Sequence, residues 1–155
     1  MSVTAPQGFR AAGVVAGLKS TGDPDVAVVV NDGPRAGAAA VFTANRCKAN
    51  PVLWSEQAIK AGSTRAVVIN SGGANCYTGP EGFATTHLTA ETAAGLLGIA
   101  PIEVQVASTG LIGLLNDRDD LLAGVRTAVA SLDAEAGPDE PPGENGRSSL
   151  NVKWL

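Results

Sequence analysis

The sequence predicts an α/β domain in which a sheet is layered against helices. Short runs of β-branched residues alternate along the chain with longer segments whose apolar residues recur at helical spacing. The length of 155 residues and the hydrophobic content of 45% are sufficient for one domain with its own core. We therefore expect a single layered α/β domain over residues 1–134.

Five segments have the composition of strands. Residues 26–30 and 66–69 are runs of mostly β-branched apolar residues, which is typical of buried strands, and residues 104–107 are expected to form another short strand. Residues 8–18 alternate glycine with small apolar residues, a pattern that suits a closely packed strand better than a helix. Residues 38–43 are expected to be the hairpin partner of residues 26–30, although the small side chains there also permit a short helix.

Three segments have the pattern of helices. The first is predicted over residues 50–62, where proline in the first turn starts the helix and glycine stops it. The second is predicted over residues 80–98, and it too begins at proline and ends at glycine. The third is predicted over residues 118–132, with Asn116 or Asp117 as its N-cap. Its apolar face consists of Leu121, Val125, Ala128, Val129 and Leu132.

The last part of the chain differs in composition. From residue 137 it has no hydrophobic periodicity and is rich in proline, glycine and polar residues. Such a segment cannot bury enough apolar surface to offset the entropy of ordering. We expect residues 135–155 to form a disordered tail outside the domain.

The charge balance argues against nucleic acid and membranes as partners. The chain carries 11 basic and 15 acidic residues, a net charge of -4, with no basic cluster. No segment approaches the roughly 20 apolar residues that a membrane-spanning helix needs. We therefore expect a soluble, cytoplasmic protein whose partners are small molecules or proteins.

Metal and cofactor sites are not expected. Cys47, Cys76 and His87 are too few and too far apart for a usual zinc site. The two cysteines lack C-x-x-C spacing, so we expect packed thiols in a reducing compartment. The sequence also lacks the glycine-rich motifs that bind nucleotide phosphates.

A polar, glycine-rich loop follows the central predicted strand. Asn70, Ser71, Gly72 and Gly73 come directly after the strand, and Asn75 lies in the same loop. Glycine lets a ligand or another chain segment approach the backbone closely, which favours a binding loop. Two adjacent glycines after a strand more often form a tight turn, and both interpretations stay open.

A second strand ends in hydroxyl groups and glycine. The Thr109 hydroxyl and a backbone N–H beside Gly110 can donate to an oxygen that becomes negative during acyl transfer, as an oxyanion hole requires. A hydroxyl-rich turn is the alternative. Ser108 is a poor candidate nucleophile because it lacks the G-x-S-x-G setting and because the only histidine, His87, falls within a predicted helix.

Four stretches, in this order, resemble the ornithine acetyltransferases, also called glutamate N-acetyltransferases, which are the bifunctional proteins of arginine biosynthesis. The stretches are GFRAAGV at residues 8–14, VFTAN at 41–45 with Lys48 and Pro51-Val52, NSGGAN at 70–75 with Thr78-Gly79, and STG at 108–110 with Ile112-Gly113. The similarity runs from about Gly8 to about Ser131 and has the character of actinobacterial members.

The resemblance implies acetyl transfer. In that family one precursor cuts itself into an α and a β chain, and the new N-terminal threonine of the β chain takes acetyl from N-acetylornithine and passes it to glutamate. Some members also use acetyl-CoA as a substrate. The oxyanion-hole threonine and glycine of the family fall on Thr109 and Gly110, and the loop at residues 70–75 falls where it supports the site. The resemblance also implies a β chain as partner, in an α/β hetero-oligomer.

The sequence departs from the family pattern in its last part. A member is expected to continue with a T-T-D motif, then K-G-x-G-M, then an A-T-M-L cleavage site, and none of these occurs here. The usual proline-methionine pair near residues 114–117 is also absent. We therefore expect the N-terminal part of an α chain, with a fold that is incomplete at its C-terminus and without the nucleophilic threonine.

Two hypotheses follow for the function. In the first, the chain carries the oxyanion hole of an N-acetyltransferase and acts only together with a β segment, so that it does not transfer acetyl groups alone. In the second, it is a catalytically inactive remnant that binds a metabolite or a partner. If a companion chain carried the β motifs, it would favour the first hypothesis.

Overall fold

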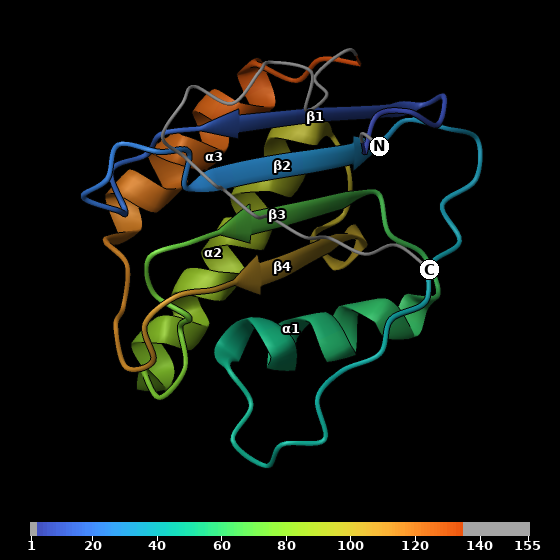
Figure 1. The fold of residues 1–155 in the computed structure, drawn as a ribbon. Helices are drawn as coiled ribbons and strands as arrows, with labels where there is room; N and C mark the ends of the chain where they lie inside the picture. The colour runs from blue at the N-terminus through green and yellow to red at the C-terminus, as the bar shows by residue number, and fades with distance from the viewer. Residues whose placement is uncertain (1–2, 135–155) are drawn as a thin grey trace.

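Four strands form one mixed sheet in the order β1-β2-β3-β4, seen face-on in Figure 1. This computed structural model describes residues 3–134, so the expected tail at residues 135–155 lies outside the described residues. The first three strands pair antiparallel, and β3 pairs parallel with β4. The strands are β1 (Phe9–Val14), β2 (Val26–Asn31), β3 (Ala66–Asn70) and β4 (Val104–Ser108).

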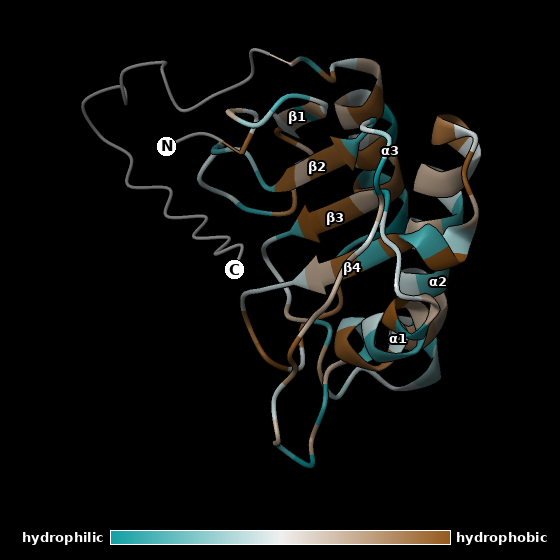
Figure 2. Cartoon of the chain, turned by 90° about the vertical axis from the view of Figure 1, so that its right-hand side faces the viewer, coloured by the Kyte–Doolittle hydropathy of each residue, from teal (hydrophilic) through white to brown (hydrophobic). Residues whose placement is uncertain are grey.

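Three α-helices lie on one side of the sheet, as the edge-on view in Figure 2 shows. α1 (Asn50–Ala58) runs along β4 and continues into the 3₁₀ turn η1 (Ile59–Ala61), while α2 (Gly79–Leu97) connects β3 to β4 through the turn η2 (Pro101–Glu103). α3 (Arg118–Ala130) follows β4. Within the described residues, the helices are too short or too polar to cross a membrane.

The helix predictions are confirmed, with small shifts at the ends. Gly98 ends α2 in the left-handed conformation, with φ of 67°. Of the two candidate caps of α3, Asp117 is the N-cap: its carboxylate accepts hydrogen bonds from the N–H groups of Asp119 and Asp120 at 2.9 and 3.1 Å.

The hydrophobic core lies between the sheet and the helices. Alternate residues of each strand face the helices, as a period of two requires, so the register places Ala12, Val28, Val68 and Val106 in one row across the sheet. All four are buried. Small residues on α2 and α3 pack against this row: Ala90, Ala93, Ala94 and Ala128.

The expected hairpin between residues 38–43 and β2 is wrong. Both edges of β2 are already paired, one with β1 and the other with β3. Residues 38–43 instead run through an exposed connection, in which Val41 is 91% exposed. Val41, Phe42 and Thr43 are strand-forming residues, but each edge of a strand accepts only one partner. The strand expected over residues 8–18 is also shorter and ends at Val14.

The outer edge of β4 is covered by side chains from α1. Within the sheet β4 pairs only with β3, so its other edge needs partners. The Ser55 hydroxyl donates to the carbonyl of Val106 at 2.9 Å and accepts the N–H of the same residue at 3.1 Å. The indole N–H of Trp54 donates to the carbonyl of Val104 at 2.9 Å. One buried serine therefore replaces a strand partner.

We expect Ser55→Ala to lower the free energy of unfolding by about 1–3 kcal/mol, because it leaves the buried N–H and C=O of Val106 without partners. Urea denaturation of the chain measures this loss. The matched control is Ser131→Ala, since that exposed hydroxyl only donates back to Thr127 in its own helix turn, and we expect a change below about 0.5 kcal/mol. Equal losses in both variants would contradict the edge-covering role.

An ion pair at the start of β1 makes stability weakly pH-dependent. The Arg10 guanidinium donates two hydrogen bonds to the Asp32 carboxylate and so lowers the pKa of that carboxyl. The stabilisation is therefore present above the pKa of an unfolded aspartate and is lost as the pH falls through the lower folded value. Because both groups are largely exposed, we expect Asp32→Asn to cost less than about 1 kcal/mol at pH 7.

This cost should shrink in acid and in salt. Between about pH 5 and pH 2 the difference between wild type and Asp32→Asn should disappear, because the wild-type carboxylate becomes protonated. It should also fall in about 1 M salt, which screens exposed charges. Urea denaturation across this pH range measures both effects, and a difference that persists at low pH would contradict the assignment.

Candidate functional site

Two loops leave the sheet at the same edge and form the candidate site. β3 and β4 are parallel, and their last residues, Asn70 and Ser108, pair with each other. The segments that follow are called the β3 loop (residues 71–78) and the β4 loop (residues 109–117). The carboxyl ends of adjacent parallel strands are where α/β sheets usually bind ligands. The two glycine-containing stretches that stand apart in the sequence therefore lie together.

Backbone hydrogen bonds join the two loops. The N–H of Leu111 donates to the carbonyl of Gly72 at 2.8 Å, and the N–H of Ala74 donates to the carbonyl of Leu111 at 3.0 Å. Further along, the N–H of Gly113 donates to the carbonyl of Cys76 at 2.9 Å. The strand-like pairing of β3 and β4 thus continues for a short distance into the loops.

Glycine is required where the loops cross. Gly110 has φ of +123°, and a Cβ atom built on it would lie 2.0 Å from the carbonyl oxygen of Gly72. On the other loop, a Cβ on Gly73 would lie 2.3 Å from the carbonyl oxygen of Leu114. These contacts are shorter than any side chain allows. Close approach of two backbones, rather than a simple tight turn, explains the glycines at positions 110 and 73.

Two hydrogen-bond donors at the start of the β4 loop have no partner within the described residues. The Thr109 N–H donates to the carbonyl of Asn70 at 3.0 Å, but the Thr109 hydroxyl and the Gly110 N–H make no hydrogen bond there. Both residues are exposed. A hydroxyl and a backbone N–H on consecutive residues can serve one negatively charged oxygen. The β4 loop therefore offers the donors that the sequence predicts.

Asn70 connects the ends of the two strands. Its side chain is only 2% exposed, and its Oδ1 atom accepts the Ser108 hydroxyl at 2.7 Å. Ser108 is thus occupied as a donor to an amide, which does not activate it as a nucleophile. The single histidine, His87, packs against the rings of Trp54 and Phe83, with centroids 4.4 and 4.5 Å away.

Asn75 and Ser71 hold the β3 loop from outside the donor pair. The buried Asn75 amide donates to the carbonyl of Gly82 at 2.8 Å and to the hydroxyl of Thr86 at 2.9 Å, so it ties the loop to α2. Ser71 donates its N–H to the carbonyl of Asp25 at 2.8 Å. Both residues therefore hold the β3 loop in place, and neither hydrogen-bonds to Thr109 or Gly110.

Sequence reasoning missed Asp25 as part of this region. Its carboxylate is 3% exposed and accepts the N–H groups of Ala16, Leu18 and Lys19 at 2.6, 2.7 and 3.1 Å. It therefore closes the connection between β1 and β2 beside the β3 loop. An aspartate next to a Gly-Asp-Pro turn was the available signal, since such side chains often accept backbone N–H groups.

Sequence reasoning also missed Asn116, which it considered only as a helix cap. The Asn116 side chain is 8% exposed, and its Oδ1 atom accepts the N–H of Gly73 at 2.7 Å, while its Nδ2 atom donates to the carbonyl of Gly73 at 3.4 Å. The two residues are 43 positions apart, so no local pattern indicates the contact.

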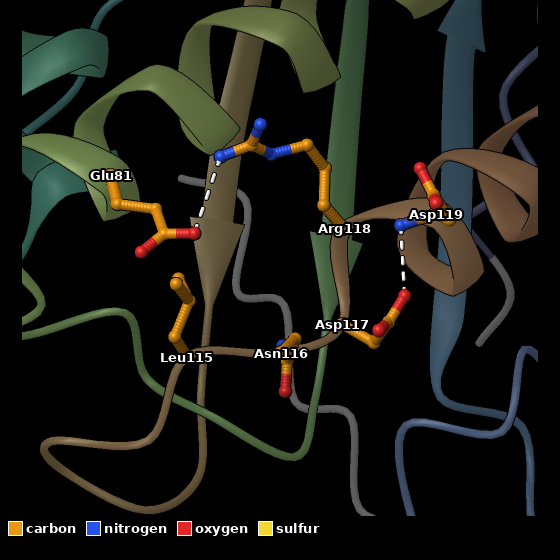
Figure 3. A pocket seen from close by; sticks show the side chains of 6 residues that line it. All are labelled: Glu81, Leu115, Asn116, Asp117, Arg118 and Asp119. Atoms are coloured by element: carbon orange, nitrogen blue, oxygen red, sulfur yellow. Dashed lines mark hydrogen bonds and ion pairs between the residues drawn. The ribbon is translucent and has the colours of Figure 1, made fainter.

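A hollow of polar residues lies beside Asn116, at the start of α3 (Figure 3). In this view the guanidinium of Arg118 extends toward Glu81, with 3.7 Å between the charged groups. Arg118 also donates to the Thr85 hydroxyl at 3.3 Å. No group of three or more metal-binding side chains occurs within residues 3–134. The residues lining the hollow are Glu81, Leu115, Asn116, Asp117, Arg118 and Asp119.

The two cysteines differ in environment. Cys76 is buried, as expected, but Cys47 is exposed, so the expectation of two packed thiols is wrong for Cys47. Cys47 lies in the long connection before α1, which does not join the core. A hydrogen bond with Cys47 raises the pKa of the exposed Tyr77 phenol, and electrostatic interactions with Cys47 and Cys76 add to this effect.

Sequence comparison relates this chain to proteins of arginine biosynthesis. The ArgJ family matches residues 10–141. The arginine biosynthesis bifunctional protein ArgJ of Streptomyces coelicolor is 60% identical over 137 residues, which are 88% of this chain and 36% of that protein. The ArgJ of Mycolicibacterium paratuberculosis is 56% identical over 135 residues, 84% of this chain and 33% of that protein. The chain therefore spans about a third of the length of the curated relatives it matches.

Solved structures confirm the fold. The ornithine acetyltransferase of Mycobacterium tuberculosis, crystallised in complex with ornithine, superposes with a TM-score of 0.84 at 54% identity, over 86% of this chain and 72% of that chain. The ArgJ protein of Bacillus halodurans superposes with a TM-score of 0.77 at 34% identity, over 81% of this chain and 65% of that chain. The expected layered α/β architecture is the one these structures share.

Proposed function

This chain belongs to the ArgJ family, and from that premise we propose that it provides the oxyanion hole of an N-acetyltransferase that moves acetyl from N-acetylornithine to glutamate. The observation that carries the proposal is the donor pair of the β4 loop. The Thr109 hydroxyl and the Gly110 N–H are exposed and without partners among the described residues, although their surroundings are held by hydrogen bonds.

The chemistry requires such a pair twice. In the first step a nucleophile adds to the acetyl carbonyl of N-acetylornithine, the tetrahedral oxyanion collapses, and ornithine leaves. In the second step the amine of glutamate adds to the acetyl-enzyme, and the nucleophile leaves from a second oxyanion. Donors that are already in place stabilise both oxyanions without reorganisation.

The Thr109 N–H does not belong to the hole, because it already donates to Asn70. The Gly110 N–H, which has no partner among the described residues, is then the backbone donor. We infer that Asn70, Ser71, Gly72, Gly73 and Asn75 support the site by fixing the β3 loop against Gly110, and that none of them touches the acetyl group. The proposal includes a cytoplasmic location.

We propose that the nucleophile comes from a partner segment rather than from the described residues of this chain. The chain corresponds to about a third of its relatives, and the proposed partner is a β chain that carries an N-terminal threonine. The chain would then work as the α part of an α/β hetero-oligomer, with acetyl-CoA as a further possible acetyl donor.

Reconstitution tests the proposal. The chain is co-expressed with the remaining C-terminal part of the Streptomyces coelicolor relative, and transfer of isotope-labelled acetyl from N-acetylornithine to glutamate is measured. We expect transfer by the purified pair and none by either part alone. A stable pair without transfer would refute the proposed function, and turnover by the chain alone would refute the need for a partner.

A further inference from the structure

The peptide group between Gly72 and Gly73 joins the two loops through both of its ends. Its carbonyl oxygen accepts the N–H of Leu111 at 2.8 Å and lies against the backbone of Gly110. The N–H of the same peptide group belongs to Gly73 and points in the opposite direction, where it donates to Oδ1 of Asn116 at 2.7 Å. The orientation of one peptide plane therefore decides whether the β4 loop is held beside Gly110.

This plane is the easiest in the loop to rotate. It has glycine on both sides, and Gly72 already adopts φ of +109°, so no Cβ atom opposes a flip. A flip would turn the carbonyl away from Leu111 and remove the contact with Gly110. Asn116 is the side chain that opposes it, because its amide bonds both the N–H and the C=O of Gly73.

The environment of Asn116 strengthens this restraint. Asn116 is 8% exposed as a residue, and hydrogen bonds with little access to water are stronger and polarise one another. The backbone around it is fixed at both ends, since the next residue, Asp117, caps α3 and the carbonyl of Leu114 packs against Gly73. Asn116 is thus held by its neighbours in a position from which it restrains the Gly72–Gly73 peptide group.

We propose that Asn116 is a positioning residue that locks the Gly72–Gly73 peptide plane and, through it, places the Gly110 N–H and the Thr109 hydroxyl for the oxyanion. The inference rests on the proposed function for its chemical meaning, but its geometric content can be tested on the chain alone. Asn116 acts through Gly73 and Gly72, so it is not itself a catalytic residue.

The test compares three variants of the full 155-residue chain by NMR. In Asn116→Leu, which has a similar size but no acceptor, we expect the Gly73 N–H to lose at least about tenfold in protection from hydrogen exchange and the Gly110 and Leu111 amide signals to shift. Asn116→Asp keeps the acceptor, so it should keep the Gly73 N–H protected. Asp117→Ala removes the neighbouring helix cap and should lower stability without moving these signals.

Several outcomes would overturn the inference. Unchanged Gly73 protection in Asn116→Leu would show that the plane holds without the amide, and equal shifts in Asp117→Ala would show a general loss of stability. If Asn116→Leu does not fold, the wild-type chain decides: a slowly exchanging Gly73 N–H beside a fast Gly110 N–H supports the lock, and similar fast exchange of both refutes it.

Activity separates this inference from the proposed function. In the reconstituted pair, Asn116→Leu should lower kcat by roughly ten- to a hundredfold with little change in KM, because donor placement matters most in the transition state. Asn116→Asp should retain most of the wild-type kcat. A wild-type pair that transfers no acetyl would refute the proposed function, while the NMR result would still decide whether Asn116 locks the peptide plane.

Discussion

Thr109→Val is expected to reduce acetyl transfer by the reconstituted pair by about a hundred- to a thousandfold, the usual effect of removing one oxyanion donor. Valine keeps the shape of threonine but has no hydroxyl. Because Thr109 is exposed and its hydroxyl makes no hydrogen bond within residues 3–134, the free energy of unfolding should change by less than about 0.5 kcal/mol. Initial rates with saturating N-acetylornithine and urea denaturation of the same samples measure both quantities.

Thr109→Ser is the matched control for this prediction. It keeps a hydroxyl at the same position and should retain activity within about tenfold, since a serine side chain loses only some rotational restraint. Activity of Thr109→Val within a few-fold of wild type would exclude the hydroxyl as an oxyanion donor. The Gly110 N–H would then be the only remaining donor of the proposed oxyanion hole.

Gly110→Ala is expected to lower the free energy of unfolding by about 2–5 kcal/mol, through overpacking and backbone strain together. The added Cβ would lie 2.0 Å from the carbonyl oxygen of Gly72, so the two loops must separate. Their separation would also break the hydrogen bond from Leu111 to Gly72. Urea denaturation measures the loss, and the reconstituted pair should become inactive because the backbone donor moves.

Gly113→Ala separates the two causes. Gly113 lies in the same loop with φ of +85°, but a Cβ atom built there would have nothing within 4 Å. This variant therefore carries the cost of the backbone conformation alone, about 1 kcal/mol. Equal losses at Gly110 and Gly113 would show that the contact between the loops contributes nothing measurable to stability.

The helices were predictable because their signals are local. Proline in the first turn and glycine at the end indicate α2, whereas a cap residue followed by an apolar face at helical spacing indicates α3. The buried strands β2, β3 and β4 were predictable for the same reason, since β-branched runs report burial directly. The STG and NSGGAN stretches also drew attention to both loops before their contact was known.

The pairings between distant segments could not be predicted in the same way. Residues 38–43 have a strand-like composition, yet β1 occupies the edge of β2 that they would need. Gly110 and Gly73 are glycines because another backbone passes within van der Waals distance, and Asn116 contacts a peptide group 43 residues earlier. Each of these depends on which segments meet in space.

The sequence was sufficient to identify the three helices, the four strands of the sheet, the positions of the two site loops and the membership of a known family. Only the tertiary structure decided which strand edges are paired, which donors of the β4 loop stay free, and which side chain holds the Gly72–Gly73 peptide. The reason is physical: propensity, capping and periodicity act over a few neighbouring residues. Hydrogen-bond saturation and steric contact depend on the whole fold, because each backbone group is available until a distant partner takes it.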